Sequence, residues 1–129
     1  MAANFDAGIW VSNDSGHIWD MKQDKSGFQD IACSSTGQYA VAARNNGYIY
    51  TSSDYGETWN DANNAGYRFW EAVASDSTGQ YLIAILNDYI YTSNDYGKTW
   101  TPTYKEGIWK DCASDSSGKY LVIVENGGY

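Results

Sequence analysis

Few residues of this 129-residue chain have the types and spacing that catalysis requires. His17 is the single histidine, and a histidine triad or a zinc site needs further ligands or partners placed around such a residue. No glycine-rich phosphate loop leads from a strand into a helix, and the ligand spacing of a calcium-binding EF-hand is absent. The sequence therefore predicts no catalytic residue, no metal site and no cofactor.

A second group of residues has the chemistry of ligand binding. Tyrosine rings beside amide and charged side chains suit a sugar or a peptide, and they occur here in segments that vary between otherwise similar parts of the chain. The candidate ligand-binding residues are Arg44, Asn63, Asn64, Tyr67, Arg68, Tyr104 and Lys105. The alternative is that Tyr67 and Tyr104 only cover the rims of the sheets and that their polar neighbours are solvated.

A repeat of about 40 residues must position these side chains. The pattern Ser-x-Asp-x-Gly-x-x-Trp occurs at residues 12–19, 52–59 and 93–100. Its repeated positions are Ser12, Asp14, Gly16 and Trp19; Ser52, Asp54, Gly56 and Trp59; and Ser93, Asp95, Gly97 and Trp100. A repeat of this length indicates a stacked architecture in which each unit packs on its neighbours.

Each unit is expected to contain four short strands. First strands are predicted at residues 28–34, 70–75 and 109–114, second strands at 39–44, 81–86 and 120–125, and third strands at 8–12, 48–52 and 89–93. The second strands are nearly continuous apolar runs, which is typical of strands covered on both faces. Asn-Gly and Asn-Asp pairs then favour tight hairpins, and fourth strands begin near residues 58 and 99. Repeated four-stranded units predict an all-β fold of β-propeller blades, with a β-solenoid as the alternative.

The repeated phrase resembles the Asp box, or BNR repeat, of sialidases and many other β-propellers. The resemblance covers all three units and implies that the turns lie on the propeller periphery, where Asp14, Asp54 and Asp95 are structural. A sialidase-like enzyme would also need an arginine cluster, a nucleophilic tyrosine with a glutamate partner, and an aspartic acid. The chain has only Arg44 and Arg68, and no catalytic phrase of the family accompanies them.

We therefore expect a non-catalytic binding or scaffold module, with a glycan or protein ligand at the loop face. The alternatives are a sialidase-like glycan-processing enzyme and a propeller fragment with no function beyond self-assembly. Phe28, Trp70 and Trp109 could stack on a ligand, but their shared place in every unit favours packing between blades.

The units predict how the chain assembles. Residues 1–129 form one repeat domain with units at 8–47, 48–88 and 89–128. The third blade is split, with its first two strands at the C-terminus and its last two at the N-terminus. Three blades are too few to close a ring, so a six-bladed homodimer is expected, in which residues 109–125 of one copy pair with residues 8–21 of the other. In this prediction residues 8–12 have no partner strand in their own chain, and the alternative is an excerpt of a longer propeller.

Composition limits the partners and the compartment. The net charge of −8 disfavours nucleic acid and anionic membranes, which require basic surfaces. Cys33 and Cys112 are expected to be reduced, buried thiols. No apolar run is long enough for a membrane span and residues 1–6 show no signal peptide, so a soluble protein is expected, its location open with the cytoplasm favoured.

Overall fold

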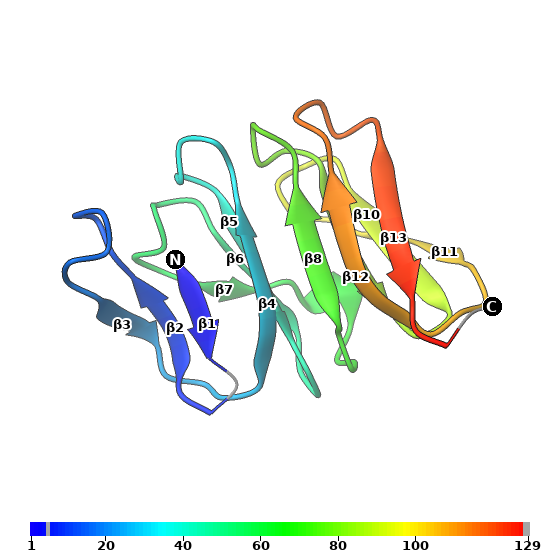
Figure 1. The fold of residues 1–129 in the computed structure, drawn as a ribbon, viewed down its shortest axis with the longest axis horizontal. Helices are drawn as coiled ribbons and strands as arrows, with labels where there is room; N and C mark the ends of the chain where they lie inside the picture. The colour runs from blue at the N-terminus through cyan, green and yellow to red at the C-terminus, as the bar shows by residue number, and fades with distance from the viewer. Residues whose placement is uncertain (5, 128–129) are drawn as a thin grey trace.

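A computed structural model of the chain describes residues 1–4 and 6–127, and its strands form four antiparallel sheets that lie side by side in a row (Figure 1). The first sheet contains β1 (Ala2–Asn4), β2 (Gly8–Val11) and β3 (Asp20–Gln23). The second contains β4 (Phe28–Cys33), β5 (Ala40–Arg44), β6 (Ile49–Ser52) and β7 (Asn60–Asp61). The third contains β8 (Ala72–Ser75), β9 (Leu82–Leu86), β10 (Tyr89–Ser93) and β11 (Thr101–Tyr104). The fourth contains β12 (Trp109–Ser114) and β13 (Leu121–Glu125), and a 3₁₀ turn, η1 (Asn63–Ala65), joins β7 to β8.

The second and third sheets are two copies of one four-stranded unit with the strand order of the sequence. Ala42 faces Tyr50 in the second sheet, and Ala84 faces Tyr91 at the same register in the third. The predicted four-stranded unit is therefore present in these two sheets. The start of unit 89–128 and most of its length are described, but its last residue, 128, lies outside the described residues.

Tight turns join the second and third strands, as expected. Asn46 and Asp88 adopt positive φ angles of 55° and 64°. Few L-residues other than asparagine and aspartate take this left-handed conformation readily. The Asn-Gly and Asn-Asp pairs therefore mark these hairpins correctly.

The first strands β4, β8 and β12 lie next to one another and align the sheets. At one end of these strands the backbone N–H of Ser35 donates to the carbonyl of Ser77 at 2.8 Å, and the N–H of Ser77 donates to the carbonyl of Ser116 at 3.1 Å. Near the middle, the Asp30 carboxylate accepts the N–H of Val73 at 3.0 Å. The same backbone contact thus joins the second sheet to the third and the third sheet to the fourth.

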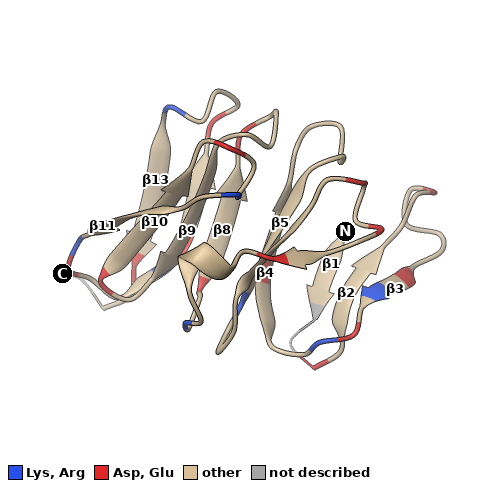
Figure 2. Cartoon of the chain, turned by 180° about the vertical axis from the view of Figure 1, so that it is seen from behind, with Lys and Arg blue, Asp and Glu red and all other residues tan. Residues whose placement is uncertain are grey.

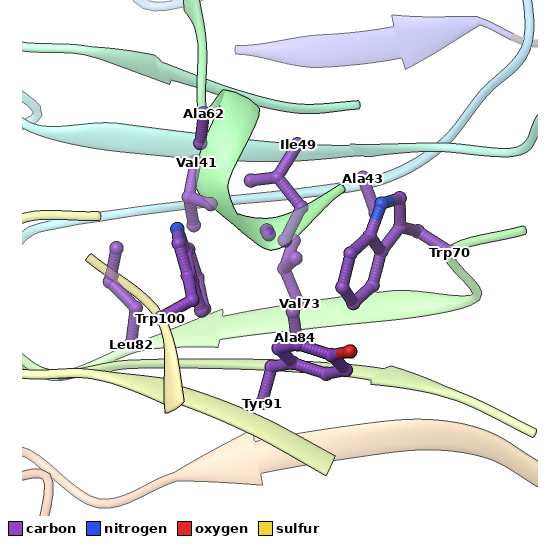
Figure 3. Close-up of a cluster of buried hydrophobic side chains, with 11 residues drawn as sticks. Val41, Ala43, Ile49, Ala62, Trp70, Val73, Leu82, Ala84, Tyr91 and Trp100 are labelled. Carbon is purple, nitrogen blue, oxygen red and sulfur yellow. The ribbon is translucent and has the colours of Figure 1, made fainter. Parts of the chain in front are cut away.

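A hydrophobic core fills each of the three spaces between neighbouring sheets. The first core contains Ile9, Phe28, Ala42 and Tyr50. The second core contains Val41, Ala43, Ile49, Ala62, Ala65, Trp70, Val73, Leu82, Ala84, Tyr91 and Trp100 (Figure 3). The third core contains Ala72, Ala74, Ile83, Ile85, Trp109 and Cys112. Residues alternate along β5 and β9 between the core on one face and the core on the other, which explains their nearly continuous apolar sequences.

The prediction that residues 8–12 lack a partner strand in their own chain is wrong. β1 pairs with β2, with Ala2 opposite Trp10 and Ala3 opposite Ile9. This register matches that of Ala42 with Tyr50, so residues 2–4 occupy the position of a second strand. Sequence inspection missed β1 because three residues are too short to show an apolar pattern.

One of the two cysteine predictions is also wrong. Cys112 is buried in the third core, but Cys33 is exposed at the end of β4. Burial, with Asp30 and Asp111 nearby, raises the pKa of the Cys112 thiol to about 12. Both thiols are free, and Cys112 stays protonated at neutral pH.

Charged residues lie mainly in turns and at strand ends, while most strand segments carry none (Figure 2). Among the described residues there is no helix long and apolar enough to cross a membrane.

Candidate binding site and the Asp-box turns

The sheets have two structurally different ends. At the Asp-box end lie the three repeated turns, each between a third and a fourth strand, together with the turns between first and second strands. At the loop end lie the hairpins between second and third strands and the loops that lead from one sheet to the next. This follows from the antiparallel order of the strands, and it groups the candidate ligand-binding residues at the loop end.

The three Asp-box turns share one hydrogen-bond network. In the second sheet the Ser52 hydroxyl donates to the Asp54 carboxylate at 2.8 Å and accepts the backbone N–H of Gly56 at 2.9 Å. The same carboxylate accepts the N–H of Thr58 at 2.9 Å, and the Trp59 indole donates to the Gly56 carbonyl at 2.9 Å. The equivalent bonds in the other turns join Ser12, Asp14, Gly16, Ile18 and Trp19, and Ser93, Asp95, Gly97, Thr99 and Trp100.

These hydrogen bonds stabilise the ionised carboxylates. The side-chain hydroxyl and backbone N–H of Thr58 hold the pKa of Asp54 below its ordinary value. The backbone N–H of Ile18 and the Ser12 hydroxyl do the same for the pKa of Asp14. Burial opposes the shift at Asp95, but hydrogen bonds from Thr99 still leave its pKa lowered. The aspartates therefore act as acceptors for turn donors, in agreement with a structural role.

The second and third Asp-box turns pack on the third strand of the preceding sheet. A Cβ atom added to Gly56 would lie 2.8 Å from Val11, and one added to Gly97 would lie 2.7 Å from Thr51. Trp100 is buried against the preceding sheet, Trp59 is half-buried, and Trp19 is exposed. Burial of the tryptophan ring thus depends on the sheet before it, and no described sheet precedes the first.

His17 lies in an exposed turn, as expected from its place in the repeat. Its Nδ1 atom is 2.6 Å from the Asp14 carbonyl, so the imidazole takes part in the turn itself. Among the described residues, no three histidine, cysteine, aspartate or glutamate side chains lie together in a group that could hold a metal ion.

At the loop end, backbone hydrogen bonds join each sheet-to-sheet loop to the neighbouring hairpin. Gly47 and Arg68 exchange two backbone hydrogen bonds of 2.9 Å, and the N–H groups of Asp88 and Lys105 take part in similar bonds of 3.0 Å between loop and hairpin. These bonds bring the loop of residues 60–68 and the loop of residues 101–108 beside the strands β6 and β10. The loops therefore present a fixed surface.

Two pairs of tyrosines stand on this surface. The rings of Tyr48 and Tyr67 meet edge to face with centroids 5.3 Å apart, and those of Tyr89 and Tyr104 do so at 5.5 Å. Tyr48 lies directly before β6 and supports Tyr67 of the following loop, whereas Tyr89 and Tyr104 are opposite residues of β10 and β11. We call these four residues the tyrosine surface.

The remaining candidate residues lie around the tyrosine surface and differ in whether their side chains already make contacts. Asn63, Asn64 and Lys105 are exposed. Arg68 already makes two contacts within the protein: its Nε donates to the Ala65 carbonyl at 3.1 Å, and its guanidinium lies 5.5 Å from the centre of the Tyr91 ring. Arg44 likewise donates to the Ser26 carbonyl at 2.6 Å, so the two arginines brace loops in two different inter-sheet regions.

Sequence reasoning missed Tyr48 and Tyr89. Each directly follows the two-residue turn between a second and a third strand, and that shared position in the repeat was the available signal. Phe28, Trp70 and Trp109 are buried in the three cores, so packing between sheets accounts for them.

Cavities occur at the Asp-box end, in the spaces between neighbouring sheets. One of about 490 Å³ lies between the first and second sheets and is lined by Val11, Cys33 and Asp54, among others. Another of about 270 Å³ lies between the third sheet and the fourth and is lined by Tyr81, Thr92 and Leu121, among others. They are features of sheet packing rather than parts of the tyrosine surface.

Comparison with known proteins agrees with the repeat. The family model described as BNR-Asp box repeat matches residues 49–62 and 90–103. No curated protein matches the sequence.

Two solved structures share the fold, those of a hydrazine synthase and of a GH74 enzyme. The hydrazine synthase of Kuenenia stuttgartiensis superposes with a TM-score of 0.67 at 15% identity, over 90% of this chain and 33% of that one. A GH74 enzyme of Niastella koreensis has a TM-score of 0.56 at 21% identity, over 69% of this chain and 13% of that one. A GH74 xyloglucanase of Xanthomonas campestris has a TM-score of 0.41 at 16% identity, over 96% and 33% of the two chains.

The chain thus spans a third or less of the length of these similar structures. Its repeated turns, its four antiparallel sheets and the matched family model agree with one another. The chain therefore carries Asp-box (BNR) repeats and has a propeller-like, all-β fold.

Proposed function

We propose that this chain is a non-catalytic binding module that takes a glycan on the tyrosine surface at its loop end. The observation that carries the proposal is the exposure of two supported rings, Tyr67 at 55% and Tyr104 at 64%. An exposed aromatic ring presents an apolar face to the C–H groups of a sugar, while its hydroxyl remains available for hydrogen bonding.

The edge-to-face pairs favour binding because they fix the rings in advance. Tyr48 supports Tyr67 and Tyr89 supports Tyr104, so less rotamer freedom is lost when a ligand stacks on them. Asn63, Asn64 and Lys105 supply exposed amide and ammonium groups for sugar hydroxyls. The net charge of −8 favours a neutral ligand over an anionic one.

The experiment is a glycan array followed by calorimetry with the best oligosaccharide. Tyr67→Ala and Tyr104→Ala should each weaken binding roughly tenfold or more, which corresponds to about 1.4 kcal/mol. Tyr81→Ala, which removes an exposed tyrosine ring at the Asp-box end, is the matched control and should leave the affinity unchanged.

Three results would contradict this proposal. An array without binding, or binding that survives both tyrosine substitutions, excludes a glycan site on the tyrosine surface. Turnover of a fluorogenic sialoside would favour the sialidase-like alternative instead.

We further propose that the protein closes as a six-bladed propeller from two copies of three blades each. β13 supports this closure, because its outer edge has no partner strand among the described residues and its first four side chains, residues 121–124, are apolar. Val122 and Val124 are 63% and 55% exposed, whereas Ile83 and Ile85 at the same register in β9 are 1% and 0% exposed. An exposed apolar strand edge favours association.

Closure predicts a particle of twice the chain mass of 14.3 kDa. Light scattering and sedimentation at micromolar concentration measure this mass directly. A stable monomer over the whole concentration range would rule out the homodimer, and would favour either a segment of a longer propeller or another partner for β13.

A further inference from the structure

We propose that β1 is a placeholder strand: in the single chain it covers the edge of β2 that β13 of a second copy occupies in the assembled protein. Association is then a strand exchange, in which β13 displaces β1. This inference rests on the proposed homodimer and specifies how that homodimer forms.

The register of the strands supports the exchange. Second and third strands pair over four residues in the second sheet and five in the third, whereas β1 and β2 pair over three. β13 has five residues and continues from β12 at the register of β9 on β8, since Val122 faces Ala113 as Ile83 faces Ala74. Pairing β13 with β2 at the register of β9 and β10 would therefore replace a three-residue ladder with a five-residue one.

The side chains of β1 also fill the space beside the first core less completely than the side chains of β13 would. Ala3 packs against the first core at the position that Val124 would take, because Ala43 and Ile85 mark the same register in the complete sheets. Both of those residues are buried. Exchange would bury the exposed valines of β13, and the burial of apolar surface stabilises an interface.

A second observation, at the Asp-box end, points independently to a second copy. A Cβ atom on Gly79 would lie 2.4 Å from Tyr39 of the preceding sheet, and one on Gly118 would lie 2.5 Å from Tyr81. Gly37 is the third glycine of this series, and a Cβ atom added to it would have no neighbouring atom within 4 Å. Tyr120, the third tyrosine of the series, is exposed. Tyr120 of a second copy would complete the series by packing on Gly37.

The backbone row at the first strands is incomplete in the same way. It runs from Ser35 to Ser77 and from Ser77 to Ser116, each N–H donating to the next carbonyl. Within the described part of the chain the row stops there. The N–H of Ser116 and the carbonyl of Ser35 in a second copy are the complementary pair that would extend it.

The first Asp-box turn has a matching position on the third sheet. Gly56 packs on Val11 and Gly97 packs on Thr51, and Thr92 is the next residue at this register. Thr92 lines the cavity of about 270 Å³. The turn of residues 12–19 from a second copy would lie there, and Trp19, 42% exposed, would be covered as Trp100 is at 5%.

These features favour a second copy over an unrelated protein. Four features lack the neighbour that their equivalents in the other units have: β13, Tyr120, Ser116 and Thr92. In each case the same chain contains a segment that would serve as that neighbour in a second copy: β2, Gly37, Ser35 and the turn of residues 12–19. In the dimer the C-terminal sheet of each copy therefore meets the N-terminal sheet of the other. The two contacts are identical and are related by a two-fold axis.

The test compares the dimer dissociation constants of full-length variants by sedimentation. Ala3→Asp places a charge where β1 packs on the first core, so it should loosen β1 and tighten the dimer at least about tenfold. Val124→Asp should abolish the dimer, because that side chain becomes buried only on exchange. Thr103→Asp, on the exposed outer strand β11, is the control and should change neither mass nor dissociation constant.

Two further variants remain informative if Ala3→Asp fails to fold. Gly37→Ala should prevent dimer formation by clashing with Tyr120, whereas Gly127→Ala, also at positive φ with open space around it, should not. Ala2→Cys with Trp10→Cys, on a Cys33→Ser background, should lock β1 onto β2 when oxidised. The oxidised form should stay monomeric and the reduced form should dimerise.

The outcomes separate this inference from the proposals on which it rests. A dimer that Ala3→Asp weakens or leaves unchanged, or that persists in the oxidised double-cysteine variant, retains the homodimer and overturns the placeholder role of β1. Monomers for wild type and Ala3→Asp alike at hundreds of micromolar overturn both. Glycan binding by the tyrosine surface is measured separately and does not depend on either result.

Discussion

Trp70→Ala is expected to lower the free energy of unfolding by about 3–5 kcal/mol. Trp70 is fully buried and belongs to the second core, between the second and third sheets (Figure 3). Its ring meets that of Tyr91 edge to face, with centroids 5.0 Å apart. Truncation would leave a cavity between two sheets whose strands hold them apart, so the space cannot easily close.

Urea denaturation at fixed protein concentration measures this loss, and a fixed concentration is needed because association would add to the apparent stability. Phe69→Ala is the matched control, since the neighbouring ring is exposed and its loss should change stability by no more than about 0.5 kcal/mol. Equal effects of the two substitutions would show that the second core does not hold the sheets together.

Trp70→Phe adds a distinction within the same site. The Trp70 Nε1 atom is buried and has no hydrogen-bond partner. An unpaired buried donor costs about 1–3 kcal/mol, so phenylalanine removes this cost while it gives up part of the packing. We therefore expect Trp70→Phe to be far less destabilising than Trp70→Ala.

Asp54→Ala is expected to cost about 1–3 kcal/mol of stability and to leave any ligand affinity unchanged. The carboxylate accepts the Ser52 hydroxyl and both the N–H and the hydroxyl of Thr58, and these donors lose their partner. Asp61→Ala is the control, because Asp61 is an exposed aspartate of the same sheet. A neutral Asp54→Ala, or a loss of glycan binding at full stability, would contradict a purely structural role.

The pH dependence of stability offers a second measurement of the hydrogen bonds that the Asp54 carboxylate accepts. Because the folded state lowers the pKa of Asp54 below the ordinary value of 3.8, the stabilisation is complete above that value. It is lost as pH falls below 3.8 and through the lowered folded pKa. The stability difference between wild type and Asp54→Ala should therefore be constant near neutral pH and shrink in acid.

The sequence by itself determined the repeat, the four-stranded unit and the Asp-box turns. These features are local: a hairpin needs a residue that tolerates positive φ, and an Asp-box turn needs its acceptors within a few residues of its donors. The signals at Asn46, Asp88 and Asp54 therefore stand directly in the sequence. The loop end could also be located, because strand order alone places residues 63, 67 and 104 there.

The tertiary structure decided which side chains form one surface and which positions are buried. Tyr48 joins the tyrosine surface because backbone bonds hold the loop that carries Tyr67 beside its hairpin, and Tyr89 joins it because β10 pairs with β11. Cys33 is exposed whereas Cys112 is buried, although both lie on first strands, because Cys33 is the last residue of β4 whereas Cys112 lies within β12 and packs in the third core. β1 is defined by pairing with β2 and not by its own three residues. Local hydrogen bonds are encoded within a few residues, whereas burial and edge pairing depend on which sheet happens to lie alongside.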